Sequence, residues 1–181
     1  MNTSSKIDVR VENQLVRFTP SSPIDGQRVV SELSGTKSGN MVIKSLESPR
    51  ATILIDEKGR IVVHGTRRIE AARAAAKEML LRLGQDEEGL TTELGPIVAS
   101  FKFSKAIDIG RFEGNFSIGK AHLDERLGCS VIEDSRHDLR IHVWPQGKAV
   151  VSEARHPNMV AMAALAWRDI LEQKKLFINP I

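Results

Sequence analysis

Residues 51–83 read ATILIDEKGRIVVHGTRRIEAARAAAKEMLLRL, and residues 139–171 read LRIHVWPQGKAVVSEARHPNMVAMAALAWRDIL. The two stretches align without a gap, so that Gly59 falls on Gly147. In each copy, alternating apolar residues around a tight turn predict two paired strands, and a run at helical spacing predicts a long helix after them. The helix is the nearest cover for the apolar face of those strands. A unit present only twice predicts a domain of two related halves rather than a solenoid.

The composition excludes several classes of protein. With 181 residues, of which 41% are hydrophobic and 27% charged, the chain is expected to be a soluble globular protein of one domain or two joined halves. Its N-terminal residues lack the apolar core of a signal peptide, and no stretch approaches the roughly 20 apolar residues that a membrane span needs. We therefore expect a cytoplasmic protein without membrane contact. The single cysteine, Cys129, excludes an intrachain disulfide and a cysteine zinc site.

Hydrophobic periodicity and turn residues place the expected elements along both halves. The first half is expected to contain a strand at 7–18, a short helix at about 25–34, a loop around 35–39, strands at 40–46, 51–56 and 60–65, and a helix at 67–83. The second half is expected to contain a strand at 97–103, a helix within 107–125, strands at 129–134, 138–145 and 148–153, and a helix from Pro157 to about Lys174. The expected domains are a first repeat at 7–84, a linker at 85–94 and a second repeat at 95–175.

The segments MVIKSLESPRATILIDEKGRIVVHGTRR, at 41–68, and SVIEDSRHDLRIHVWPQGKAVVSEAR, at 130–155, carry a family resemblance. They resemble the repeat of the archaeal and eukaryotic TATA-binding protein family, and the resemblance extends over about residues 7–174. The chain is identified as a divergent, archaeal-like member. The resemblance implies an α+β saddle, with a curved antiparallel sheet, long helices on its convex face and a concave face that lies in the DNA minor groove.

Position by position, the resemblance implies a set of DNA-binding residues. The apolar and base-edge positions of the concave face are Asn13, Leu15, Leu54, Val62, His64, Val98, Val150 and Ser152. The phosphate contacts are Arg60, Arg67, Lys148 and Arg155, and the wedges between base steps are Leu127 and Trp144. The acidic loop that docks a transcription factor B type protein is matched by Asp124 and Glu125.

The sequence departs from the family pattern at three positions. Gly39 and Asp56 stand where the first half should carry wedge phenylalanines, and Pro96 stands where the second half should carry an asparagine. Gly39 has no side chain to insert, and a carboxylate at Asp56 is expected to face the phosphates. Trp144 alternates with Val143, which places it on the opposite sheet face from the apolar strand residues. It is interpreted either as a wedge or as an ordinary core aromatic.

Other chemistry finds little support in the sequence. Residues 114–121 approximate a phosphate-binding loop, but Ala121 replaces the hydroxyl that would hold magnesium. The histidines show no metal-ligand spacing, and Cys129 has no adjacent nucleophile signature. Serine, histidine and aspartate are too common in the chain for a catalytic triad to be argued from the sequence. The sequence therefore predicts a protein that is not an enzyme and has no cofactor or metal.

Two functions remain open. In the first, the chain is a transcription initiation factor, associated with the nucleoid, that binds double-stranded DNA in the minor groove, A/T-rich if specific, and recruits a transcription factor B type protein. In the second, the same fold has lost sequence-specific TATA binding and is an interaction module whose concave face holds a protein partner or closes a homodimer. The basic residues at equivalent positions of both halves favour the first. Gly39, Asp56 and Pro96 favour the second.

Overall fold

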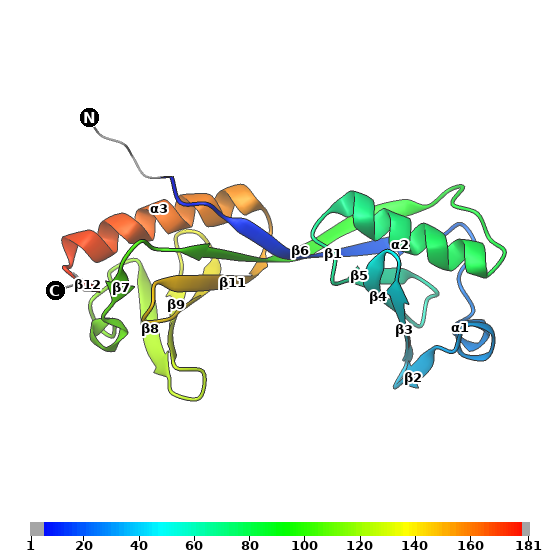
Figure 1. Ribbon diagram of the computed structural model, residues 1–181, viewed down its shortest axis with the longest axis horizontal. Helices are drawn as coiled ribbons and strands as arrows, with labels where there is room; N and C mark the ends of the chain where they lie inside the picture. Colours follow the sequence, from blue (N-terminus) through cyan, green and yellow to red (C-terminus); the bar gives the residue numbers. More distant parts are fainter. Residues whose placement is uncertain (1–5, 179–181) are drawn as a thin grey trace. The chain divides into compact units, whose positions relative to one another are not determined.

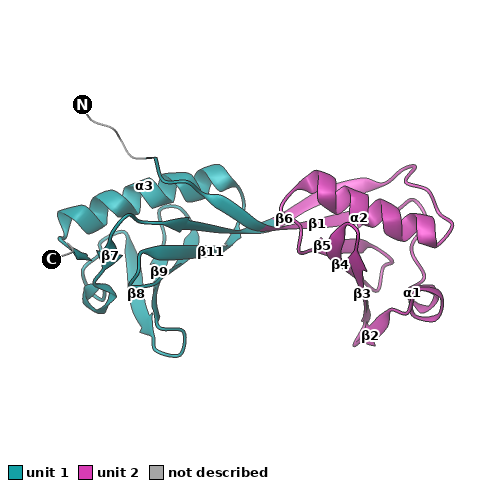
Figure 2. Ribbon diagram, in the orientation of Figure 1, with its two compact units in different colours: residues 1–12, 96–181 teal, residues 13–95 magenta. Residues whose placement is uncertain are grey.

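The computed structural model describes residues 6–178, which form two compact units, each with its own core (Figure 2). Unit 2 contains Asn13–Gly95. Unit 1 contains the described residues up to Glu12 together with those from Pro96 onward. The chain therefore leaves unit 1 after its first strand residues, builds all of unit 2 and then returns to unit 1.

Unit 2 is an antiparallel sheet with two helices. The strand order is β2-β3-β4-β5-β1, and α2 lies along one face of the sheet (Figure 1). The elements are β1 (Arg10–Thr19), α1 (Gly26–Leu33), β2 (Thr36–Ser38), β3 (Met41–Glu47), β4 (Arg50–Ile55), β5 (Ile61–His64) and α2 (Ile69–Arg82).

Local chemistry explains the limits of the elements in unit 2. The side chain of Asp25 accepts a hydrogen bond from the amide of Gln27 at 3.0 Å and so caps the start of α1. In the β4–β5 turn, Gly59 has φ +74°, and a Cβ there would lie 2.6 Å from the backbone nitrogen of Ile24. Apolar side chains of α2, such as Ala76 and Met79, are fully buried against the sheet, which fixes the face that the helix covers.

Unit 1 repeats this arrangement with the strand order β6-β11-β10-β9-β8, covered on one face by α3 (Figure 1). Its elements are the part of β6 (Thr91–Lys102) that follows Gly95, β7 (Ala106–Ile107), the 3-10 helix η1 (Ile109–Arg111), β8 (Gly119–Asp124), β9 (Cys129–Asp134), β10 (Leu139–Val143), β11 (Lys148–Ala154), α3 (Pro157–Gln173) and β12 (Phe177–Ile178). Pro157 takes the first turn of α3, as expected, where its missing N–H costs nothing. β12 pairs with β7 in a separate two-stranded sheet.

The expected repeat boundaries differ from the compact units. Ile7, Val9 and Val11 pack against the core of unit 1, and Ser100 donates a hydrogen bond to Glu12 at 2.7 Å. Residues 7–12 therefore lie in unit 1, together with the residues from Pro96 onward. The expected linker at 85–94 is part of unit 2, where Glu87 lies 3.2 Å from Lys77.

The helix expected within 107–125 was wrong. That segment contains β7, the single-turn helix η1 and the edge strand β8. Glycines interrupt any longer helix, and Gly119 lies so close to β9 that a Cβ there would be 2.5 Å from the carbonyl oxygen of Glu133. The loop expected around 35–39 was also wrong in part, because Thr36–Ser38 forms β2 and pairs with β3.

Candidate nucleic-acid interface

Each sheet has one face packed on helices and one open face, defined here as the face away from its core cluster. In unit 2, alternation places Ile53 and Val63 in the core and their neighbours on the open face. Ile43, Leu54 and Val62 form a row there across β3, β4 and β5, because Ile43 pairs with Leu54 and Leu54 with Val62. These three side chains are only partly buried. The open face of unit 2 is therefore an apolar surface.

The open face of unit 1 carries a corresponding row. Val150 pairs with His142, and His142 pairs with Val131, across β11, β10 and β9. His122 of the edge strand β8 extends the row because it pairs with Val131. This row contains two imidazoles where unit 2 has only aliphatic side chains, so the two open faces differ chemically.

The two expected wedges of unit 1 come together in the structure. The indole Nε1 of Trp144 donates a hydrogen bond to the carbonyl oxygen of Leu127 at 3.0 Å, which joins the end of β10 to the β8–β9 turn. Leu127 is 54% exposed. The ring of His142 stacks on Trp144, with centroids 6.3 Å apart and planes inclined by 27°. Trp144 is therefore not a core aromatic but part of the open face.

The environment of His142 keeps its ring uncharged at neutral pH. Burial lowers the pKa of His142 below its usual value of 6.5, and the nearby charge of Arg140 lowers it further. Asp124 acts in the opposite direction and is outweighed. The lowered pKa favours the neutral imidazole in the stacked His142–Trp144 pair.

Asp56, expected to face the phosphates, is engaged within its own turn. Its carboxylate accepts hydrogen bonds from the amides of Lys58 and Arg60 at 2.9 Å and lies 2.6 Å from the Arg60 guanidinium. Burial alone would raise the pKa of Asp56, but the hydrogen bonds from Arg60 and Lys58 outweigh it and lower the pKa below its usual value. The Arg60 guanidinium is therefore paired with Asp56. To contact a phosphate it would have to leave this ion pair, whereas its counterpart Lys148 is exposed.

Other arginines beside the open faces are also paired with carboxylates. Arg17 on β1 pairs with Glu93 on β6 within unit 2. Arg140 on β10 pairs with Glu133 on β9 at 2.9 Å within unit 1. The exposed cations of the unit 1 open face include Lys148, and its register partner is Lys102 on β6. Two exposed lysines of this face are therefore neighbours on the β6–β11 pair.

The remaining expected residues lie at the ends and the centre of the open faces. Asn13 accepts a hydrogen bond from the amide of Gly65 at 2.7 Å, so its carbonyl oxygen secures the end of β5 beside exposed His64. Leu15 and Val98 alternate with core residues of β1 and β6 and are partly buried. The remaining three, Arg67, Ser152 and Arg155, lie where β5 and β11 end, with both arginines exposed and Ser152 partly buried.

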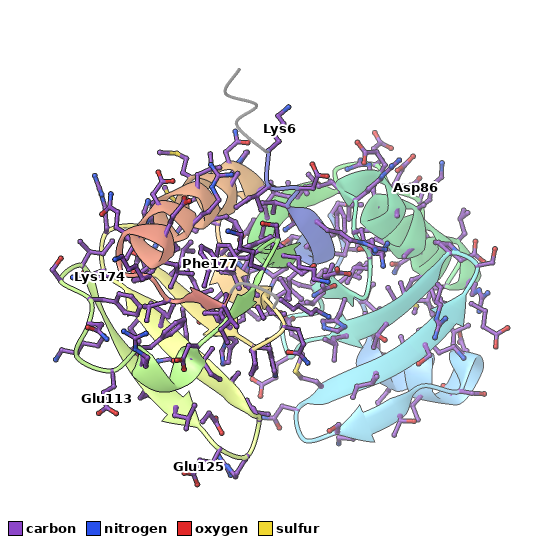
Figure 3. The ribbon with its side chains drawn as sticks, turned by 60° about the vertical axis from the view of Figure 1, so that its left-hand side comes forward. Lys6, Asp86, Glu113, Glu125, Lys174 and Phe177 are labelled. Atoms are coloured by element: carbon purple, nitrogen blue, oxygen red, sulfur yellow. The ribbon has the colours of Figure 1, made fainter. Side chains whose placement is uncertain are left out.

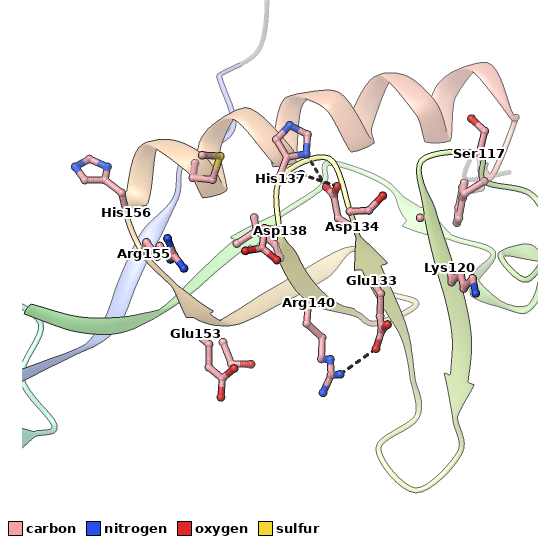
Figure 4. Close-up of a pocket in the computed structure, with 16 residues that line it drawn as sticks. Ser117, Lys120, Glu133, Asp134, His137, Asp138, Arg140, Glu153, Arg155 and His156 are labelled. Carbon is pink, nitrogen blue, oxygen red and sulfur yellow. Dashed lines mark hydrogen bonds and ion pairs between the residues drawn. The ribbon is translucent and has the colours of Figure 1, made fainter.

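A groove of about 1060 Å³ lies in unit 1, beside the end of β11 and the strands β8 to β10 (Figure 4). It is lined by side chains of both charges, among them Lys120, Glu133, Arg140, Glu153 and Arg155. Its balance of acids and bases does not select one charge of ligand. Among residues 6–178, the His, Cys, Asp and Glu side chains form no group that could hold a metal ion, and no helix there is long and apolar enough to cross a membrane.

The two acidic residues of the turn between β8 and β9 have different roles. The carboxylate of Asp124 accepts hydrogen bonds from the amides of Arg126 and Leu127 at 3.1 and 3.2 Å, so it shapes the turn. Glu125 projects from the tip of the hairpin (Figure 3). Of the two residues expected to contact a protein partner, Glu125 is the one whose side chain is fully presented.

Sequence reasoning missed several members of the open faces. His142 could have been found from alternation alone, because it lies two residues before Trp144 on the same strand face. Ile43 and Lys102 required the strand register, which pairs Ile43 with Leu54 and Lys102 with Lys148. A single sequence does not give that register.

The comparison with solved structures establishes the fold. The structure of TBP from Methanococcus jannaschii matches with a TM-score of 0.80 and 16% sequence identity, covering 92% of this chain and 99% of that chain. The expected α+β class, with a duplicated antiparallel sheet backed by long helices, is confirmed. A heterotetrameric sarcosine oxidase from Corynebacterium sp. U-96, in complex with pyrrole 2-carboxylate, matches at 8% identity over 96% of this chain and 88% of that chain, but its TM-score of 0.31 is too low to indicate a shared fold.

Comparisons at the level of sequence add no family. No protein-family model matches the chain, and no curated protein matches it. Fold alone does not define function, because one fold serves many sites.

Proposed function

We propose that this chain binds double-stranded DNA in the minor groove through the open faces of its sheets and acts in transcription initiation. The observation that carries the proposal is the row of partly buried side chains on the open face of each unit, aliphatic in Ile43–Leu54–Val62 and mixed in Val150–His142. Apolar side chains presented by a sheet suit the floor of a widened minor groove. The fold of a TBP supports this use of the face.

The charges predict an interaction of modest salt dependence. Arg17, Arg60 and Arg140 each have a carboxylate partner. We assign the phosphate contacts to three exposed cations of unit 1, Lys102, Lys148 and Arg155. Three phosphate contacts correspond to a slope of roughly −3 for log K against log salt, because each neutralised phosphate releases about 0.9 of a counterion.

A gel-shift titration with A/T-rich and G/C-rich duplexes, at about 50 mM and about 200 mM salt, tests the proposal directly. Lys148→Glu together with Arg155→Glu should weaken binding to both duplexes and flatten the salt dependence. Lys174→Glu together with Lys175→Glu, in the turn after α3, is the matched charge control and should have little effect. Failure of the unaltered chain to bind any duplex would refute the proposal.

Recruitment of a transcription factor B type protein to the β8–β9 turn is the second part of the proposal. Glu125→Lys is the discriminating substitution, because Asp124 also holds the turn together. We expect Glu125→Lys to remove recruitment to a preformed DNA complex while DNA affinity stays the same or rises slightly, since a rim charge acts mainly on partner encounter. Normal recruitment by this variant would exclude the turn as the docking surface.

The interaction-module hypothesis is the second candidate, and the carboxylates beside the open faces favour it. Glu93 and Glu133 would be repelled by phosphates if their arginine partners turned to DNA, whereas a protein surface could accept both signs of charge. Sedimentation equilibrium separates the two candidates. A stable homodimer that does not dissociate on adding duplex DNA would support the module.

A further inference from the structure

We infer that the open face of unit 1 is a binding site for unpaired bases of single-stranded DNA, which stack on the His142–Trp144 pair. The inference shares a surface with the proposed duplex binding but does not depend on it. A wedge between base steps must penetrate a duplex, whereas a flat aromatic pair can accept a base that is already unstacked.

The geometry of Trp144 favours stacking over insertion. Its indole nitrogen is held by the carbonyl oxygen of Leu127 at 3.0 Å, and its ring lies at 27° to the ring of His142. A ring fixed both by a hydrogen bond and by a stacked neighbour loses little freedom when a base binds. The partly buried ring leaves area for a ligand.

The strand register places cations next to this pair. The backbone amide of Trp144 donates to the carbonyl oxygen of Lys148 at 2.9 Å, and Lys148 pairs with Lys102 on the adjacent strand. Two exposed lysines beside an aromatic pair combine stacking with attraction for a phosphate backbone. The lowered pKa of His142 supports the stack, because an uncharged imidazole presents its face without a charge on the ring.

The site of unit 1 has no counterpart in unit 2. There, the position equivalent to Trp144 is Asp56, whose carboxylate closes its own turn on Arg60. The row neighbour equivalent to His142 is Leu54. A stacked aromatic pair that a base can extend is therefore available in one unit alone among the described residues.

Intrinsic fluorescence offers a direct measurement. The chain has two tryptophans, and Trp167 is 1% exposed with its Nε1 bonded to Asp134 at 2.6 Å. Quenching by an added strand therefore reports on Trp144. Titration of the full chain with a short oligothymidylate should quench the emission, while an abasic strand of equal length and charge should quench it little.

Variants test whether the His142–Trp144 pair and its neighbouring lysines bind the oligothymidylate. Trp144→Ala should weaken oligothymidylate binding about tenfold or more, measured by anisotropy of a labelled strand, and Trp144→Phe should recover part of the loss. Lys102→Glu with Lys148→Glu should weaken binding and reduce its salt dependence. Met162→Ala, on the exposed side of α3, is the control and should bind normally.

The outcomes separate this inference from the duplex proposal. Equal binding of the oligothymidylate and the abasic strand, unchanged affinity in Trp144→Ala, or binding of oligouridylate but not oligothymidylate would each overturn it. Duplex binding that survives Trp144→Ala while single-strand binding is lost would support it. Single-strand binding without any duplex binding would support it as well and refute only the proposed function.

Discussion

Asp56 and Asp134 each use a carboxylate to organise the backbone of a turn. The carboxylate of Asp134 is buried, and its two oxygens accept from the amides of Arg136 and His137 at 2.9 Å, from the His137 ring at 2.6 Å and from Trp167 at 2.6 Å. Asp56 serves its turn in the same way but is less deeply placed. These contacts depend on atoms brought together by folding, so the sequence alone suggested for Asp56 a role towards phosphates.

Asp56→Asn should lower stability at pH 7 by about 1–2 kcal/mol, because the carboxylate accepts charge-assisted bonds from Arg60. The folded pKa of Asp56 lies below its ordinary value of 3.8, so its contribution is present above that value and is lost as the pH falls through the folded pKa. Urea unfolding should therefore show a deficit at pH 7 that disappears in strong acid. Glu57→Gln, an exposed neighbour, is the control.

Asp134→Ala should be far more costly, about 3–5 kcal/mol, because it leaves the indole and imidazole donors without their buried acceptor. The matched control is Glu133→Ala, which removes an exposed ion pair with Arg140 and should cost less than about 1 kcal/mol. Chemical unfolding followed by circular dichroism measures both. Equal losses for the two variants would contradict the assigned role of Asp134.

At the scale of elements, the sequence predicted best where alternation and tight turns agree. The paired strands β4–β5 and β10–β11 and the helices α2 and α3 follow from the repeated stretches. The edge strand β8 was missed because its apolar alternation is short and follows several glycines. That error also hid the contact between Leu127 and Trp144, since it requires β8 and β9 to form a hairpin.

The two equivalent turn glycines give a prediction at this scale. A Cβ on Gly59 would lie 2.6 Å from the nitrogen of Ile24, and one on Gly147 would lie 2.7 Å from the carbonyl oxygen of Lys105. Gly59→Ala and Gly147→Ala should each cost about 2 kcal/mol or more, because backbone strain and a clash add. Gly39→Ala, with φ +58° and nothing within 4 Å, should show the strain alone, about 1 kcal/mol. Thermal unfolding of the three variants measures the difference.

Strand β11 contains a strained residue. Glu153 has φ +62°, and the pairing of β11 with β6 shifts between Val151 and Ala154. We expect Glu153→Gly to raise stability by about 1 kcal/mol, because glycine adopts this conformation without the cost of a Cβ. Glu153→Val should lower stability, and a reversed order in urea unfolding would contradict this assignment.

At the scale of the whole molecule, the two units share the first strand. Val11 packs against the core of unit 1, whereas Leu15, four residues later, lies on the open face of unit 2. Both tryptophans belong to unit 1, so their fluorescence reports on that unit. The sequence predicted the duplication but not the change of unit within β1, although the apolar alternation changes phase between Val11 and Val16, where that change occurs.

Val11→Ala should therefore shift the tryptophan-detected unfolding of unit 1 to lower urea, by about 1 kcal/mol for a partly buried side chain. Leu15→Ala should leave this signal nearly unchanged, since it removes no contact with the unit 1 core. Hydrogen exchange of α2 amides provides the complementary readout for unit 2. An equal shift of the tryptophan signal in both variants would contradict the assignment of Val11 to unit 1 and Leu15 to unit 2.

Because residues up to Glu12 belong to unit 1 and Asn13–Gly95 form unit 2, the two units are completed at different times during translation. Every residue of unit 2 has been synthesised once Gly95 is in place, so that unit can fold while most of its partner is still untranslated. Ile7 and Val9, although translated first, pack against a core cluster whose buried members all lie at Ile97 or later in the chain. The earliest apolar side chains must therefore wait for the latest ones, and unit 1 depends on contacts of high sequence separation that close slowly. During that interval the side chains of Ile7 and Val9 have no core to pack against, and we expect this exposed apolar segment to favour chaperone binding or aggregation.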